Sequence, residues 1–90
     1  MDFQSLLFMP PIKALRVDLI AYAKKRSLLK KLRKQIGIFE QNPKHPSLNT
    51  EALEPRKLKI YSFRIDKRYR AIFIYIDGEV EIIDINLHYQ

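Results

Sequence analysis

The sequence predicts an α+β domain in which two N-terminal helices pack on a mainly antiparallel sheet, with the element order β-α-α-β-β-β. Three observations predict this class. Apolar residues recur at three- and four-residue steps through most of residues 12–39, as on one face of a helix. A proline-rich stretch then interrupts that pattern, and the rest of the chain reads as strands joined by short turns. At 90 residues and 47% hydrophobic content, we expect one domain spanning residues 1–90.

The N-terminal part predicts one strand and two helices. Residues 3–9 are mostly apolar and predict a strand that ends at the prolines that follow. Two apolar stripes with helical spacing come next: Ile12, Leu15, Leu19 and Tyr22, and then Leu28, Leu29, Leu32, Ile36 and Phe39. Ser27 is a residue type that caps helices, so we expect a break near residues 25–27.

Residues 42–57 predict a long loop, because Pro43, Pro46 and Pro55 forbid regular helix there. A loop of this length in so small a domain is more often functional than idle.

Three strands follow the loop. We expect them at residues 59–65, 69–76 and 79–87, with a turn at 66–68 and a hairpin at Asp77-Gly78, a strong two-residue turn signal. The middle strand is apolar on both faces and is therefore predicted to be central.

Charge and composition limit the class of protein. The net charge is +7, and all seventeen Lys and Arg fall in residues 1–70. Residues 71–90 contain Asp and Glu but no Lys or Arg. This asymmetry favours a polyanion or an acidic partner. The chain has no Cys and two His, which excludes disulfides and cysteine catalysis and argues against a zinc site, so we expect no metal and no cofactor. No apolar run reaches the ~18 residues of a membrane span, so we expect a cytoplasmic protein without a membrane partner.

Alternation along the strands predicts a polar face on the sheet. Ser62 and Arg64 share one face of their strand, and Asp84, Asn86 and His88 share one face of the last strand. Arg70 opens the strand between them. We therefore expect Arg64, Arg70 and His88 on one open surface of the sheet. The long loop would place Glu54 and the basic residues Arg56, Lys57 and Lys59 near its edge.

These side chains suit cleavage of RNA without a metal ion. In that reaction the 2′-hydroxyl attacks the adjacent phosphate, which requires a base, an acid and donors for the growing charge. Arg64 and Arg70 are the candidate phosphate donors, His88 exchanges protons near neutral pH, and Glu54 is a candidate base. Tyr89 is a candidate for base stacking or proton donation. Each residue also has a structural explanation, as solvated surface charge or as part of a chain terminus.

Five short segments occur in an order that resembles the RelE/ParE superfamily of toxins from type II toxin–antitoxin modules, which includes plasmid-stabilisation toxins. They are Asn42-Pro43, Pro46-Ser47-Leu48, Tyr61-Ser62 with Arg64, Tyr69-Arg70, and His88-Tyr89. No single segment is specific, whereas their order and spacing are fairly specific. The terminal His-Tyr resembles the YoeB-like members of the mRNA-cleaving branch.

The resemblance implies a function and partners. It implies a toxin that enters the ribosome and cuts mRNA there, held inactive by a cognate antitoxin, for which the basic surface favours an acidic, partly disordered segment. It assigns catalysis to Arg64, Arg70, His88, Tyr89 and, by position in the loop, Glu54. RNA binding would fall to the remaining basic residues near the sheet, which are Arg56, Lys57, Lys59 and Arg68. Two alternatives stay open: a ParE-like inhibitor of DNA gyrase, and an inactive relative that only binds antitoxin.

Overall fold

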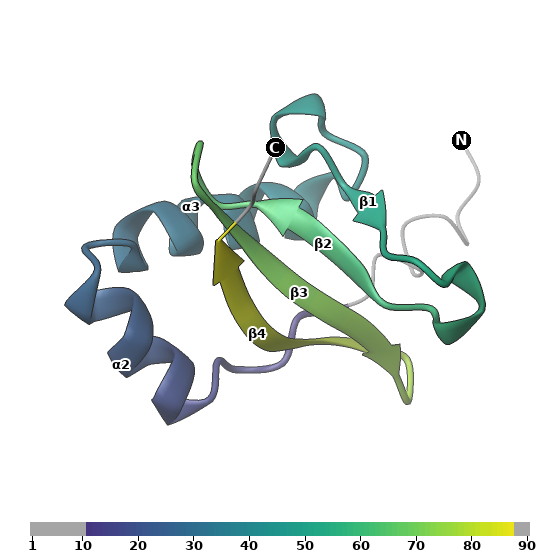
Figure 1. Ribbon diagram of the computed structural model, residues 1–90, viewed down its shortest axis with the longest axis horizontal. Coiled ribbons are helices and arrows are strands. Elements are labelled where there is room, and N and C mark those ends of the chain that lie inside the picture. Colours follow the sequence, from purple (N-terminus) through teal and green to yellow (C-terminus); the bar gives the residue numbers. More distant parts are fainter. Residues whose placement is uncertain (1–10, 88–90) are drawn as a thin grey trace.

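The computed structural model describes residues 11–87, which form two helices and a four-stranded sheet (Figure 1). The elements in chain order are α2 (Val17–Lys25), α3 (Leu29–Gln41), β1 (Glu51–Ala52), β2 (Tyr61–Arg64), β3 (Tyr69–Ile76) and β4 (Glu79–Leu87). The sheet has the order β1-β2-β3-β4, and every neighbouring pair is antiparallel. This confirms the predicted α+β class. The strand predicted at residues 3–9 lies outside the described residues.

The segment before α2 is extended, not helical as its apolar spacing predicted. Ile12 forms a parallel bridge with Val80 of β4. The N–H of Val80 donates to the carbonyl of Pro11 at 2.9 Å, and the N–H of Lys13 donates to the carbonyl of Val80 at 2.8 Å. These bonds cover the backbone edge of β4, which explains why the helix begins only at Val17. Ile12 and Leu15 still pack against the core, so their apolar character serves the extended segment.

The two helices break where the sequence predicted, but not by the predicted cap. Ser27 takes a left-handed conformation with φ 57°, and Leu28 occupies the N-cap position of α3 without a side-chain cap. The N–H of Leu28 donates to the carbonyl of Ala23 at 2.8 Å, which closes the end of α2. A left-handed residue at a helix C-terminus is the usual way to reverse the chain.

Three phenylalanines join α3 to the sheet. Phe39 of α3 lies 5.7 Å from Phe63 and 5.2 Å from Phe73, measured between ring centroids. All three side chains are fully buried. In Figure 1 helix α3 passes behind the strands and covers one face of the sheet, while α2 lies to its side. Burying such rings typically stabilises a fold by ~1.5–3 kcal/mol each.

The strand register fixes which side chains share the other face. Arg64 of β2 lies opposite Arg70 of β3, and Arg70 lies opposite Asn86 of β4. Because Phe63 points to the helices, its neighbour Arg64 points away from them. A register shift between Ile72 and Phe73 lets the polar face continue along β4 on the same side.

The predicted boundaries of β3 and β4 are correct, and the hairpin between them uses Asp77 at φ 51° and Gly78 at φ 78°. Two consecutive positive φ values are those of a type I′ turn, the turn that matches strand twist. The strand predicted at 59–65 is shorter, because Lys59 takes φ 56° at the end of the 3₁₀ turn η2 (Arg56–Leu58). The predicted loop 42–57 contains the short strand β1 and the 3₁₀ turn η1 (Pro46–Leu48).

Candidate functional site

Arg70 is the most constrained charged residue on the sheet face that points away from the helices, which we call the helix-free face. Its Nε donates to the Ser62 Oγ at 2.9 Å, and its Nη2 donates to the carbonyl oxygens of Ser62, at 3.3 Å, and of Asn49. Its Nη1 lies 4.0 Å from the Glu51 Oε1. The residue is only 4% exposed. The sequence predicted an open position for Arg70, and this was wrong, because the chain around Asn49 and Glu51 folds over the guanidinium.

Burial lowers the pKa of the Arg70 guanidinium, Glu51 raises it, and Arg64 lowers it further. A guanidinium stays protonated through shifts of this kind at any physiological pH. Most of its five N–H groups already have acceptors. Arg70 therefore provides a fixed positive charge at this place, rather than a mobile side chain.

Arg64 is the accessible guanidinium of the pair. It is exposed and stands directly across from Arg70, where opposed side chains have Cβ atoms ~5 Å apart. The positive charges of Arg64 and Arg70 repel each other, and Glu51 beside Arg70 offsets part of this repulsion. An exposed planar fork next to a fixed second cation fits a phosphate or another small oxyanion.

Arg68 lies at the same end of the sheet, in the bend that joins β2 and β3. Asp66 builds this bend: its Oδ1 accepts from the N–H of Arg68 at 2.8 Å and from the N–H of Tyr69 at 2.9 Å. Lys31 of α3 pairs with the other Asp66 oxygen at 3.4 Å. The bend therefore holds Arg68 near the Arg64–Arg70 end through backbone contacts.

Gln35 supports the site from the helix side of the sheet, and the sequence interpretation missed it. This buried side chain of α3 donates from Nε2 to the carbonyl of Arg64 at 2.8 Å and to that of Ser47 at 3.1 Å. It ties together the end of β2 and the loop after α3. A signal for it was available, because Gln35 lies between Leu32 and Phe39 in the apolar stripe of α3. A polar residue in a core stripe needs a buried partner.

The loop before β1 is shaped by its own side chains. The Asn42 Oδ1 accepts from the N–H of Lys44 at 3.1 Å, and the His45 Nδ1 accepts from the N–H of Ser47 at 3.1 Å. Asn49 then takes φ 43°, a left-handed conformation that Asn tolerates better than most residues. This geometry brings the Asn49 carbonyl to Arg70. Sequence reasoning missed both Asn49 and Glu51 as neighbours of Arg70.

Glu54 and its basic neighbours lie near the opposite end of β2. Ala52 pairs with Tyr61 at the start of β2, and Glu54 follows two residues later, whereas Arg64 ends the strand. Three strand residues span ~10 Å. Glu54 is exposed and pairs with Arg56 at 3.4 Å. The structure therefore brings Glu51, and not Glu54, to Arg70. Lys57 and Lys59 are exposed with Arg56, away from Arg64.

His88 and Tyr89 lie outside the described residues. The last described residue, Leu87 of β4, is opposite Tyr69, and its predecessor Asn86 is opposite Arg70. β4 therefore carries the chain to the Arg64–Arg70 end of the sheet.

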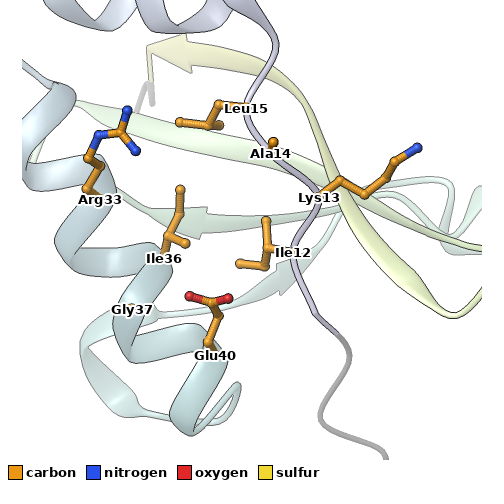
Figure 2. A pocket seen from close by; sticks show the side chains of 8 residues that line it. All are labelled: Ile12, Lys13, Ala14, Leu15, Arg33, Ile36, Gly37 and Glu40. Carbon is orange, nitrogen blue, oxygen red and sulfur yellow. The ribbon is translucent and has the colours of Figure 1, made fainter.

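Two hollows open on the helix side. Figure 2 shows one of about 260 Å³, where Ile12 and Leu15 of the extended segment face Ile36 of α3, and where Arg33 and Glu40 stand at the rim. The second, of about 580 Å³, lies between the loop after α3 and the strands. We name it the aromatic groove, after Tyr61, Phe73 and Tyr75 on its strand side.

Residues 11–87 contain no group of three or more His, Cys, Asp or Glu side chains that could hold a metal ion. Within the same range, neither helix has the length and apolar character needed to cross a membrane.

Comparisons with known proteins identify the fold. No family model matches the chain. An uncharacterized protein of Haemophilus influenzae is 42% identical over 43 residues, which cover 48% of this chain and 43% of that protein, so the match spans less than half of the relative. Two solved structures are similar over most of the chain, each with 18% sequence identity over 88% of it. They are a YoeB/ParE toxin from Agrobacterium tumefaciens, with a TM-score of 0.64 and 96% of that chain covered, and a YoeB-YefM complex from Staphylococcus aureus, with a TM-score of 0.55 and 94% covered.

The chain therefore has the α+β fold of the RelE/ParE-like toxins. More narrowly, it is structurally similar to YoeB/ParE toxins, as the resemblance in its sequence implied.

Proposed function

We propose that this protein is the toxin of a type II toxin–antitoxin module and acts as a ribosome-dependent mRNA endoribonuclease that inhibits translation. The observation that carries the proposal is the pair of arginines, Arg64 and Arg70, directly opposite each other on the helix-free face. The similarity in fold to YoeB/ParE toxins supports the class of protein. The net charge of +7 supports a polyanion such as RNA as the substrate.

The proposed reaction is metal-free acid–base cleavage. The RNA 2′-oxygen loses its proton and attacks the adjacent phosphorus, and the bond to the 5′-oxygen breaks as that oxygen receives a proton. Arg64 contacts the non-bridging phosphate oxygens, which gain charge in the transition state. Arg70 adds a fixed positive charge from its buried position. The backbone pairing of β2 with β3 keeps Arg64 directly opposite Arg70.

The proton-transfer groups of this proposal are His88, Tyr89 and Glu54. His88 is the residue whose ordinary pKa suits both directions of transfer near neutral pH. Glu54 lies near the other end of β2 and pairs with Arg56, so it acts as the base only if its side chain and that of Arg64 extend to the same phosphodiester. Arg68 would bind RNA beside Arg64, while Arg56, Lys57 and Lys59 would bind it near Glu54.

The proposed protein partner is an antitoxin with an acidic segment that folds on contact. The +7 charge provides the attraction, and one of the similar structures is a complex of YoeB with a second chain, YefM. Attraction of this kind weakens with salt, because surface charges are screened within ~8–10 Å at physiological ionic strength.

Induced expression of Arg64→Gln tests the proposal, with Arg33→Gln on helix α3 as the matched control. Both residues are exposed, so neither change should unfold the protein. The wild type should arrest translation and create new mRNA 5′ ends within translated codons. Arg64→Gln should reduce that cleavage by ~10²–10³-fold, the usual loss for one oxyanion donor, and Arg33→Gln should keep most of it.

Three results would contradict the nuclease proposal. Undiminished cleavage by Arg64→Gln would remove Arg64 from the reaction. DNA damage that depends on gyrase, with intact mRNA, would support the ParE-like alternative. Harmless overexpression with tight antitoxin binding would support an inactive relative.

A further inference from the structure

The aromatic groove is a feature that the proposed cleavage site does not use. It lies on the helix side of the sheet, whereas Arg64 and Arg70 lie on the other face. Its strand wall is made of three rings. Tyr61 and Phe73 are stacked with centroids 5.6 Å apart, and Tyr75 meets both edge-on, at 5.6 Å from Tyr61 and 5.8 Å from Phe73.

The rings of this wall differ in exposure. Phe73 is fully buried and belongs to the core, Tyr61 is half-buried, and Tyr75 is 51% exposed. Burial and the neighbouring Tyr61 both raise the pKa of Tyr75, so its phenol stays protonated and able to donate a hydrogen bond. An exposed aromatic ring beside a hollow of about 580 Å³ gives a flat ligand a surface to stack on.

The opposite wall combines polar side chains with two prolines and carries no negative charge. Beside Pro43 and Pro46 it includes Lys44, His45, Asn49 and Thr50, and none of the described residues that line the groove is acidic. Because the His45 Nδ1 accepts from the N–H of Ser47, the neutral ring carries its proton on Nε2. Lysine provides a point charge for phosphate, and an asparagine amide can pair with the edge of a base.

We propose that the aromatic groove binds one unpaired nucleotide of an RNA strand, with the base stacked on the exposed ring of Tyr75 beside the nearly perpendicular ring of Tyr61, and with the phosphate toward Lys44. Aromatic rings with adjacent cations are how proteins hold single-stranded RNA. This inference rests on the proposed function for the identity of the ligand as RNA. It adds a second contact, on the far face of the sheet from the arginine pair.

An apolar protein segment is the competing occupant, and the charge of the groove argues for the nucleotide. A purely apolar segment would leave Lys44 and the amide of Asn49 without partners and would have to desolvate them. A nucleotide supplies an anion, a flat ring and polar edges together.

The binding test uses the whole protein, without ribosomes, and adenosine 5′-monophosphate as the probe. Tyrosine ring signals are followed by NMR during the titration, with adenosine and inorganic phosphate in separate titrations. The nucleotide should shift the Tyr61 and Tyr75 signals saturably, adenosine should do so with lower affinity, and phosphate alone should leave the rings unmoved. An unmoved pair of tyrosines at millimolar nucleotide would overturn the proposal.

Variants separate stacking from mere apolar contact. Tyr75→Leu should weaken nucleotide binding at least about fivefold, the low end for loss of one base–aromatic stack. Tyr75→Phe keeps the ring and should stay within roughly twofold of the wild type. Lys44→Gln should weaken binding of the nucleotide but not of adenosine. Equal affinity of Tyr75→Leu and the wild type would refute the inference, as would shifts of these rings by antitoxin but not by nucleotide.

The outcome can be told apart from that of the nuclease proposal. Arg64→Gln should bind the nucleotide in the groove as the wild type does, because Arg64 lies on the other face. Loss of cleavage with retained binding therefore concerns the arginine pair alone. Loss of nucleotide binding in Tyr75→Leu, while the nucleotide still shifts the tyrosine signals of the wild type, concerns the groove alone.

Discussion

Replacing Arg70 by alanine is expected to lower the free energy of unfolding by ~3 kcal/mol. The guanidinium donates three hydrogen bonds, to the Oγ and carbonyl of Ser62 and to the carbonyl of Asn49. A hydrogen bond from a charged donor contributes ~1.5–3 kcal/mol to stability. The full sum is not reached, because the variant no longer buries a charge and because Glu51, with a side chain 44% exposed, recovers water contacts.

The loss is large for a domain of this size. Domains of 90 residues have unfolding free energies of ~5–13 kcal/mol, so ~3 kcal/mol is nearly a quarter of the upper value and more than half of the lower. The midpoint of thermal unfolding should fall by ~12–24 °C. Urea unfolding followed by far-UV circular dichroism measures the change, and Arg64→Ala is the matched control, for which we expect less than ~0.5 kcal/mol.

A loss below ~1 kcal/mol in Arg70→Ala would refute this reasoning, since the three bonds would then contribute almost nothing. A loss of the expected size has a practical consequence. Reduced toxicity of Arg70→Ala would mix lost structure with lost chemistry, so Arg64 is the residue on which the cleavage proposal should be tested.

Two further predictions concern the supports of the site. Gln35→Leu removes the donor for the carbonyls of Ser47 and Arg64. We expect the free energy of unfolding, measured with urea, to fall by ~1–3 kcal/mol. Little change would mean that water replaces the amide at those carbonyls and that Gln35 is not a support of the site. For Asp66, burial raises the pKa, but bonds from the N–H groups of Arg68 and Tyr69 and from Lys31 outweigh it and leave the pKa below its usual value of 3.8. A lowered folded-state pKa stabilises the fold above the unfolded pKa and loses that contribution as pH falls through the folded value. The stability difference between the wild type and Asp66→Asn should therefore hold steady from about pH 5 to 7 and shrink below about pH 4; a difference that grew on acidification would contradict the sign.

Local signals in the sequence were sufficient for β3, β4 and the turn between them. Asp77-Gly78 takes the backbone conformation that this pair of residues favours, so the hairpin and both strand limits follow from short-range chemistry. Strand alternation likewise placed Arg64 and Arg70 on one face, because the register of antiparallel strands preserves that alternation.

Contacts between distant parts of the chain account for what the sequence did not predict. Ile12 and Leu15 have helical spacing, but the open edge of β4 captured that segment as extended chain. Arg70 was expected in the open because its strand position shows its face and not what folds over that face. The cover comes from residues near Asn49, more than twenty positions earlier, and no pattern of alternation or spacing encodes that approach.

The position of Asn49 couples the two sides of the sheet. Its carbonyl accepts from the buried guanidinium, while the same residue belongs to the wall of the aromatic groove. A ligand that displaces this one peptide therefore changes the environment of Arg70, and any anion that draws on Arg70 changes the affinity of the ligand by the same factor. Binding of a ligand on one face of the sheet is thereby transmitted to the other face through a single residue.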